Sequence, residues 1–335
     1  MCGVAVQNGM SGGLGTSAWS IGVDFGTSFS KAVAARAVSA TDATLREVKP
    51  LRIGDAAGWN RPFLTPSSMF LDRERVHFGP RAVERLIAAN LEGRELVRSF
   101  KTILGANDFE GALNLFPRAT VDPDRLFRLR DLIVLYLAYL LALVDATTHS
   151  AFGQADATRA SRLRFTRPGW IPDRIAAAHE TMSSLFNQAH LVHQALGGAL
   201  LDHAGVNYGQ ARAALDAAAA NRSPFASLDG GIYEASAVGL CHYHDPSAPN
   251  FLLIVDIGAG TTDVAGLMRA PFGKDIQVVR TGRRTIDVAG DHCDAALVNL
   301  LLAKSGLRAN ADRLAFWRTI VPVVRDLKEE LFDRG

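Results

Sequence analysis

The hydrophobic and polar positions of this chain form short strand-like runs separated by longer helical stretches. Ser20–Phe25 alternates in the manner of a buried strand. Phe251–Ile257 is a continuous apolar run, which predicts a strand covered on both faces. Further short strands are predicted at 31–37, 68–71, 162–166 and 263–268.

Helical periodicity accounts for much of the remaining chain. Apolar residues spaced three and four apart predict an amphipathic helix over 80–96, and Pro123 with Asp124 signals the start of a helix that reaches about Thr148. Residues 172–222 are Ala-rich and helical in pattern, a helix follows Gly290, and a final helix is predicted over 316–331. Strands that alternate with helices indicate an α/β fold.

Composition narrows the class of protein. The chain has 335 residues, of which 48% are hydrophobic and 21% charged, which excludes a disordered chain, a collagen-like repeat and a disulfide-rich mini-protein. The formal net charge of +2 gives no reason to expect a nucleic-acid or membrane partner. Three widely spaced cysteines, Cys2, Cys241 and Cys293, do not form a disulfide framework, so a reducing compartment is expected.

Two segments, 1–19 and 132–144, bear on where the protein is located in the cell. Residues 1–19 lack a positive region and an apolar core, so they are interpreted as a flexible leader and not a secretory signal. The apolar run 132–144 would span only about 20 Å as a helix, less than the roughly 30 Å of a bilayer core. We therefore expect a buried helix and a cytoplasmic protein.

One internal similarity points to chemistry. In each of two segments, an apolar strand ends in an aspartate that is followed by a Gly/Thr turn. Glycine allows backbone N–H groups to approach a phosphate, hydroxyls add donors, and a carboxylate can hold hydrated Mg²⁺. Two such loops facing one cleft could clamp a triphosphate, whereas a single one would be more simply an ordinary hairpin turn. The residues are Asp24, Gly26, Thr27 and Ser28 in the first loop and Asp256, Gly258, Gly260, Thr261 and Thr262 in the second.

At these two loops the sequence resembles the phosphate-binding motifs of the actin/Hsp70/sugar-kinase ATPase superfamily, and Hsp70-like proteins most of all. IGVDFGTSFSKAV and LLIVDIGAGTTDVA carry the resemblance. Five further segments resemble Hsp70 motifs in the same order, namely Phe100–Gly105, 164–170, 234–240, 289–294 and 326–331. The resemblance implies a two-lobed actin-like fold with ribonuclease-H-like lobes.

The resemblance also implies roles for individual residues. Asp24 and Asp256 would hold Mg²⁺, and Lys101, Glu234 and Asp256 would be the catalytic residues, with Lys101 orienting the attacking water. ATP or ADP would be bound by Gly26, Thr27, Ser28, Gly258, Gly260, Thr261, Thr262, Gly290 and Lys328.

The domain organisation implied by the resemblance is a leader, a first lobe and an incomplete second lobe. The chain is expected to end inside the second lobe, before a third, Gly-rich adenosine loop, which would leave this form with weak ATP binding and negligible hydrolysis. The expected ranges are 1–19 for the leader, 20–248 for the first lobe, about 61–120 for its small subdomain, about 172–222 for an Ala-rich insertion, and 249–335 for the partial second lobe.

Three functions are compatible with these motifs. The first is an Hsp70-like ATPase whose nucleotide state drives lobe closure, with unfolded protein clients or co-chaperones as partners. The second is an actin-like filament or scaffold protein that assembles with ATP. A small-molecule kinase is the third, but no catalytic aspartate motif for an acceptor hydroxyl is evident. Lys101 and Glu234 favour the first function.

Overall fold

The computed structural model describes most of the chain, and all structural statements below refer to these residues. They are 19–37, 46–89, 93–98, 100–105, 108–152, 162–167, 170, 172–221, 228–234, 249–272, 275–286, 288–321 and 323–333. The expectations for residues 1–18 and for 235–240 of the Hsp70-like segment 234–240 concern residues outside these ranges.

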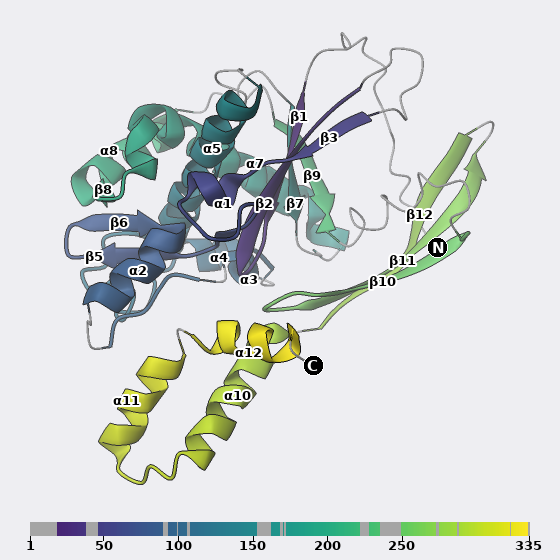
Figure 1. Ribbon diagram of the computed structural model, residues 1–335. Helices are drawn as coiled ribbons and strands as arrows, with labels where there is room; N and C mark the ends of the chain where they lie inside the picture. Colours follow the sequence, from purple (N-terminus) through teal and green to yellow (C-terminus); the bar gives the residue numbers. More distant parts are fainter. Residues whose placement is uncertain are drawn as a thin grey trace.

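A mixed six-stranded sheet organises the first part of the chain (Figure 1). Its main path runs β3-β2-β1-β7-β9, and β4 pairs with β2. β1 is antiparallel to β2 but parallel to β7, and β7 is parallel to β9. The strands are β1 Ser20–Phe25, β2 Phe29–Ala37, β3 Arg46–Pro50, β4 Thr65–Pro66, β7 Arg162–Arg167 and β9 Leu228–Tyr233.

Two long helices, α5 Leu129–Phe152 and α7 Ile175–Leu196, pack against this sheet. The ring of Phe25 on β1 lies 5.6 Å from that of Tyr136 on α5. The ring of Phe165 on β7 stacks on Phe186 of α7 at 4.6 Å. Every residue from Leu132 to Val144 is buried, as the apolar run predicts. Within the described residues, no helix is long and apolar enough to cross a membrane.

Smaller elements flank this core. A three-stranded antiparallel sheet, in the order β5-β6-β8, packs against α2 through Phe70 and Ala82. These elements and the remaining helices of the first part are β5 Met69–Asp72, β6 Arg75–Phe78, β8 Val206–Asn207, α1 Ile53–Ala56, α2 Gly79–Ala89, α3 Phe100–Gly105, α4 Phe109–Leu113, α8 Tyr208–Ala220, and the 3-10 turns η1 Pro172–Arg174 and η2 Gly197–Leu201.

The C-terminal part, which we define as β10 to α12, contains an antiparallel sheet in the order β10-β11-β12 followed by three helices. Figure 1 shows this sheet set apart from the six-stranded one, with the helices grouped at one end of it. The elements are β10 Phe251–Ile257, β11 Thr262–Phe272, β12 Asp275–Ile286, α10 Gly290–Lys304, α11 Asn310–Ile320 and α12 Val324–Asp333.

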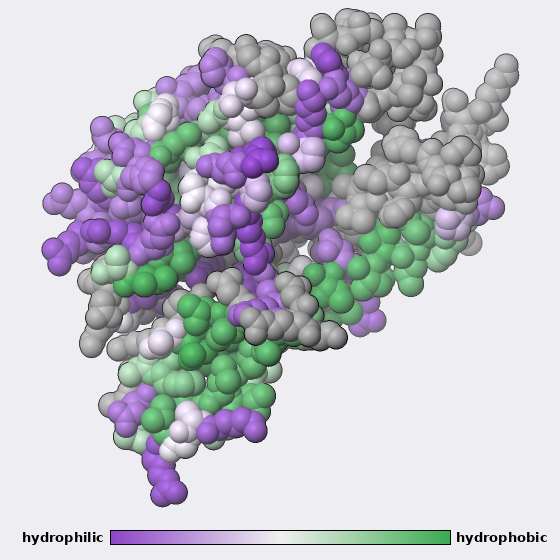
Figure 2. Space-filling model, in the orientation of Figure 1, coloured by the Kyte–Doolittle hydropathy of each residue, from purple (hydrophilic) through white to green (hydrophobic). Residues whose placement is uncertain are grey.

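The α/β class and the strands at Ser20–Phe25 and Phe251–Ile257 are confirmed, but the expected burial of β10 on both faces is wrong. One face packs Ile254 with Ala265, Leu267 and Tyr233. The other face exposes alternate apolar side chains, and Ile257 is 70% exposed. Figure 2 shows the resulting apolar surface along this sheet. An apolar run predicts the strand, but it does not determine whether other elements cover both faces.

Two helix boundaries also differ from the predictions. The helix predicted over 80–96 ends at Ala89, and Val97 instead bridges to Met69 in an extended segment. The helix predicted to start at Pro123 starts at Leu129, because the Asp122 carboxylate accepts a hydrogen bond from the N–H of Phe127 and holds a turn there.

The single helix predicted over 316–331 is two helices, α11 and α12. Pro322 falls between them in the sequence, and proline lacks the N–H that a continuous helix needs. The Ala-rich segment is likewise divided, into α7 and α8 with η2 and β8 between them. β12 was not predicted from the sequence.

Candidate functional site

The two Asp-Gly loops are turns of equivalent hairpins. In the first hairpin Asp24 on β1 pairs with Lys31 on β2, and in the second Asp256 on β10 pairs with Asp263 on β11. The first turn needs glycine, because a Cβ on Gly26 would lie 2.2 Å from the carbonyl oxygen of Phe29. The second turn is closed by a 2.9 Å hydrogen bond from Gly258 N–H to the carbonyl of Thr261.

These two turns lie against each other. A Cβ on Gly260 would be 3.3 Å from Thr27 Cγ2 and 3.2 Å from the hydroxyl of Thr102 on α3. Because both contacts are close, the absence of a side chain at position 260 is what allows the second turn to approach the first this closely. Backbone groups of two hairpins from distant parts of the sequence therefore border one space.

Charged side chains surround that space. Lys31 Nζ lies 3.1 Å from Asp24 Oδ2, and the Thr166 hydroxyl donates a hydrogen bond to the other oxygen of Asp24. The buried ammonium of Lys101, at the start of α3, forms an ion pair with Glu234. Burial opposes ionisation of Asp24, but the charges of Lys101 and Lys31 and the Thr166 hydroxyl outweigh it, so the pKa of Asp24 is lowered.

Glu234 has the most unusual electrostatics in the cluster. Burial is the main cause that raises its pKa to about 7, and the negative charges of Asp24 and Asp256 add to the rise. Lys101 acts in the opposite direction through its charge and hydrogen bond. Since both aspartates act on Glu234, three carboxyl groups share the space beside Lys101.

A pH-dependent stability follows from Glu234 in the nucleotide-free protein. The group has a folded pKa of about 7 against an ordinary value of 4.5, so the folded state binds the extra proton between these values. The stabilisation is complete below pH 4.5 and is lost as the pH rises through 7, to an extent of about 3 kcal/mol. Glu234→Gln should remove this dependence, so its urea midpoint should fall less than that of the wild type between pH 5 and pH 8. The experiment uses EDTA, and parallel profiles for the two proteins would contradict the prediction.

The first turn of α10 is hydrogen-bonded to the second loop. Gly290 N–H donates to the carbonyl of Gly258 at 3.1 Å, and Asp291 N–H donates to that of Ala259 at 2.7 Å. Lys328 on α12 reaches the same place, with Nζ 3.4 Å from the carbonyl of Gly290 and 2.5 Å from Asp294 Oδ1. The helices of the C-terminal part thus continue one side of the space between the hairpins.

The structure brings together the residues singled out in the sequence, with differences in what their side chains do. Thr262 donates its hydroxyl to the carbonyl of Val288 at 2.7 Å, and so supports its own loop. The hydroxyl of Ser28 is buried and has no hydrogen-bond partner. Asp24 is already engaged by Lys31 and Thr166, whereas no hydrogen bond or ion pair of Asp256 with another described residue is found.

The carboxylates fit a hydrated divalent cation better than a fully coordinated one. No group of three or more His, Cys, Asp or Glu side chains in the described part of the chain is arranged to hold a metal ion together. Mg²⁺ usually takes only one or two protein carboxylates and keeps waters and phosphate oxygens as its other ligands. Asp256, Asp24 and Glu234 crowd negative charge into one space, which is the donor set such an ion requires.

Sequence reasoning missed Lys31, Thr166 and Thr102. Lys31 carried a signal: lysines are few among the 36 basic residues, and position 31 faces Asp24 across any tight hairpin. Thr166 carried none, because its contact depends on β7 lying parallel to β1.

Comparisons with known proteins give a distant structural likeness. No protein-family model and no curated protein matches the sequence. Among solved structures, the chain is similar to MreB 5 of Spiroplasma citri bound to AMPPNP, with a TM-score of 0.45 and 14% identity. The match covers 93% of this chain, which spans 62% of the length of that protein.

Proposed function

We propose that this chain binds Mg²⁺ and ATP between its two hairpin loops and, as part of an Hsp70-like nucleotide-binding domain, hydrolyses the ATP. One observation supports this most: the two equivalent turns, each after a strand that ends in aspartate, are in contact at Gly260 and Thr27. Two unrelated hairpins are not expected to have the same strand register after the aspartate and also to place their turns in contact.

The loops supply donors for phosphate oxygens. Backbone N–H groups in a glycine-rich turn can point at one anion, and a hydroxyl can donate to another. In this proposal Gly26, Thr27 and Ser28 bind the phosphates from one side, and Gly258, Gly260, Thr261 and Thr262 bind from the other. Gly290 and Lys328 lie next to the second loop and would also contact the nucleotide.

The charged cluster supplies the groups that hydrolysis needs. Mg²⁺, when bound, would neutralise phosphate charge and orient the terminal phosphate. Asp256 and Asp24 would hold its waters. Glu234, with a pKa near 7, is suited to accept a proton from the attacking water, since a general base works best with a pKa near the operating pH. Lys101 would hold Glu234 in place and offset charge on the terminal phosphate.

The metal role of Asp256 gives the direct test. Asp256→Asn should weaken ATP binding about tenfold with Mg²⁺ and much less in EDTA, because the lost carboxylate acts through the ion. Calorimetric titration measures both affinities, and Asp312→Asn, at an exposed position on α11, is the matched control. Equal losses with and without Mg²⁺ would exclude a metal role, and no binding by the wild type would exclude the proposed function.

The proposal extends to two lobes, 20–248 and 249–335, that close on ATP and act on protein clients. The ion pair between Arg61 and Glu329 supports closure of the two lobes, because it joins the first part of the chain to its last helix, α12. Light scattering separates this from the alternative of an ATP-dependent filament or scaffold protein. A rise in scattering on adding Mg²⁺ and ATP would favour the filament, and we expect none.

A further inference from the structure

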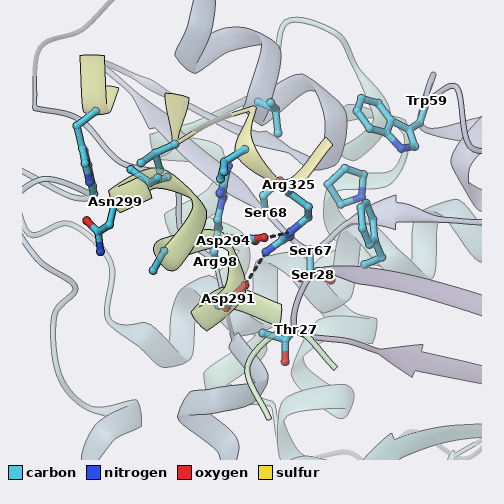
Figure 3. A pocket seen from close by; sticks show the side chains of 18 residues that line it. Thr27, Ser28, Trp59, Ser67, Ser68, Arg98, Asp291, Asp294, Asn299 and Arg325 are labelled. Carbon is cyan, nitrogen blue, oxygen red and sulfur yellow. Dashed lines mark hydrogen bonds and ion pairs between the residues drawn. The ribbon is translucent and has the colours of Figure 1, made fainter. Parts of the chain in front are cut away.

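A cavity of about 370 Å³ lies between the first part of the chain and the helices α10 to α12 (Figure 3). Thr27 and Ser28 of the first loop line it, so it is continuous with the space between the hairpins. Its opposite wall comes from α10 and α12, with Asp291, Asp294 and Arg325. The volume is within the range of about 300–1,000 Å³ found for small-molecule sites.

Arg98 is the residue in this cavity without an evident structural role. It forms no hydrogen bond or ion pair with any residue that the structure describes. The carboxylates that could pair with it are occupied, because Arg325 lies 2.7 Å from Asp291 and Lys328 lies 2.5 Å from Asp294. Figure 3 shows Arg98 beside these side chains.

The side chain of Arg98 is exposed, and charges of both signs lie near it. Although its surface is open to the cavity, nearby protein atoms desolvate it and lower its pKa, and the positive charge of Arg325 lowers the pKa further. Asp291 and Asp294 act in the opposite direction but do not outweigh these effects. An anion in the cavity would stabilise this side chain.

Three buried polar atoms of the cavity lack a hydrogen-bond partner. One is an acceptor, Asp294 Oδ1, which lies 2.5 Å from Lys328 Nζ, and the other two belong to donor groups. The indole N–H of Trp59 and the hydroxyl of Ser28 line it, and both are buried without a hydrogen-bond partner. An indole N–H and a guanidinium can only donate, so a ligand here must bring acceptor oxygens. A guanidinium fork matches the oxygens of a phosphoryl group and can bind two of them at once.

We propose that this cavity is an anion site in which Arg98 binds the terminal phosphate of the nucleoside triphosphate, extending the phosphate site beyond Thr27 and Ser28. That the phosphate belongs to a nucleotide rests on the proposed function. That the cavity binds an anion rests only on the residues that line it. Arg98 thereby makes the site selective for a triphosphate over a diphosphate.

The test compares three ligands by calorimetric titration with Mg²⁺: ATP, ADP and inorganic tripolyphosphate. Arg98→Met keeps the length of the side chain but removes its charge, and Arg308→Met, at an exposed position after α10, makes the same change outside the cavity. Arg98→Met should weaken ATP binding at least about tenfold and ADP binding less than about twofold. Arg98→Lys should be intermediate, because an ammonium keeps the charge but not the fork. A thermal melt verifies that each variant is folded.

The outcomes separate two questions: whether the cavity is an anion site, and whether the anion is the phosphate of a nucleotide. Equal effects of Arg98→Met on ATP and ADP, or no effect on either, would overturn the inference and leave the proposed function intact. A wild type that binds neither nucleotide but binds tripolyphosphate in an Arg98-dependent manner would keep the anion site and overturn the nucleotide as its source. If a variant unfolds, the comparison of ATP with ADP in Arg98→Lys decides alone.

Discussion

In a longer, active protein that contains the whole nucleotide-binding domain, replacing Lys101 with alanine is expected to reduce ATP turnover about 100-fold, with a much smaller loss of nucleotide affinity. The ammonium lies beside Glu234, and removing it takes away charge that would stabilise the transition state more than the bound substrate. Without its partner, Glu234 would take up a proton more readily, which limits the build-up of negative charge against the phosphates. Steady-state turnover and calorimetric affinity, measured on the same preparation, test both parts.

Lys101→Arg is the informative control for this prediction. It keeps the charge, but a planar fork does not occupy the position of a compact ammonium in a buried ion pair. Turnover should therefore stay well below that of the wild type. Unchanged turnover in Lys101→Ala would show that this lysine only supports the packing of α3.

Placing valine at Gly260 should weaken ATP binding about 10-fold to 100-fold while the protein remains folded. The added side chain would meet Thr27 and Thr102 at about the distance where atoms begin to overlap, so the second turn must move away from the first. Overpacking of this kind costs about 1–3 kcal/mol, which corresponds to this range of affinity. The loss should be similar with and without Mg²⁺, unlike that of Asp256→Asn.

Gly198→Val is the matched control, because no atom lies within 4 Å of the position that its Cβ would take. It should bind ATP as the wild type does. If Gly260→Val bound ATP equally well, phosphate would not lie between the two turns, and the proposed function would lose its main support.

The local sequence was sufficient to predict those elements whose structure depends mainly on residues close together in the chain. The alternation in Ser20–Phe25, the apolar run Phe251–Ile257 and the buried stretch within α5 each identified an element correctly. The glycine turns were found for the same reason, since a backbone that passes within 2.2 Å of a missing Cβ at Gly26 tolerates no other residue.

Boundaries were less predictable, because they depend on contacts that periodicity does not contain. The helix assigned to 80–96 ended early because Val97 pairs with Met69 on β5. The start of α5 moved to Leu129 because the Asp122 carboxylate holds the preceding turn. In both cases the spacing of apolar residues was compatible with a longer helix, but specific hydrogen bonds stabilised a non-helical backbone instead.

The sequence by itself determined the two strand-Asp-Gly units and the α/β class, because turn chemistry and hydrophobic period are local properties. Only the tertiary structure decided that Thr166 donates to Asp24 across 142 positions, that Glu234 is crowded by two aspartates, and that Arg98 faces a cavity without a partner. It also decided that one face of β10 is exposed. These properties depend on which strands become neighbours and which surfaces are covered, and the free energy of such contacts comes from residues far apart in the chain.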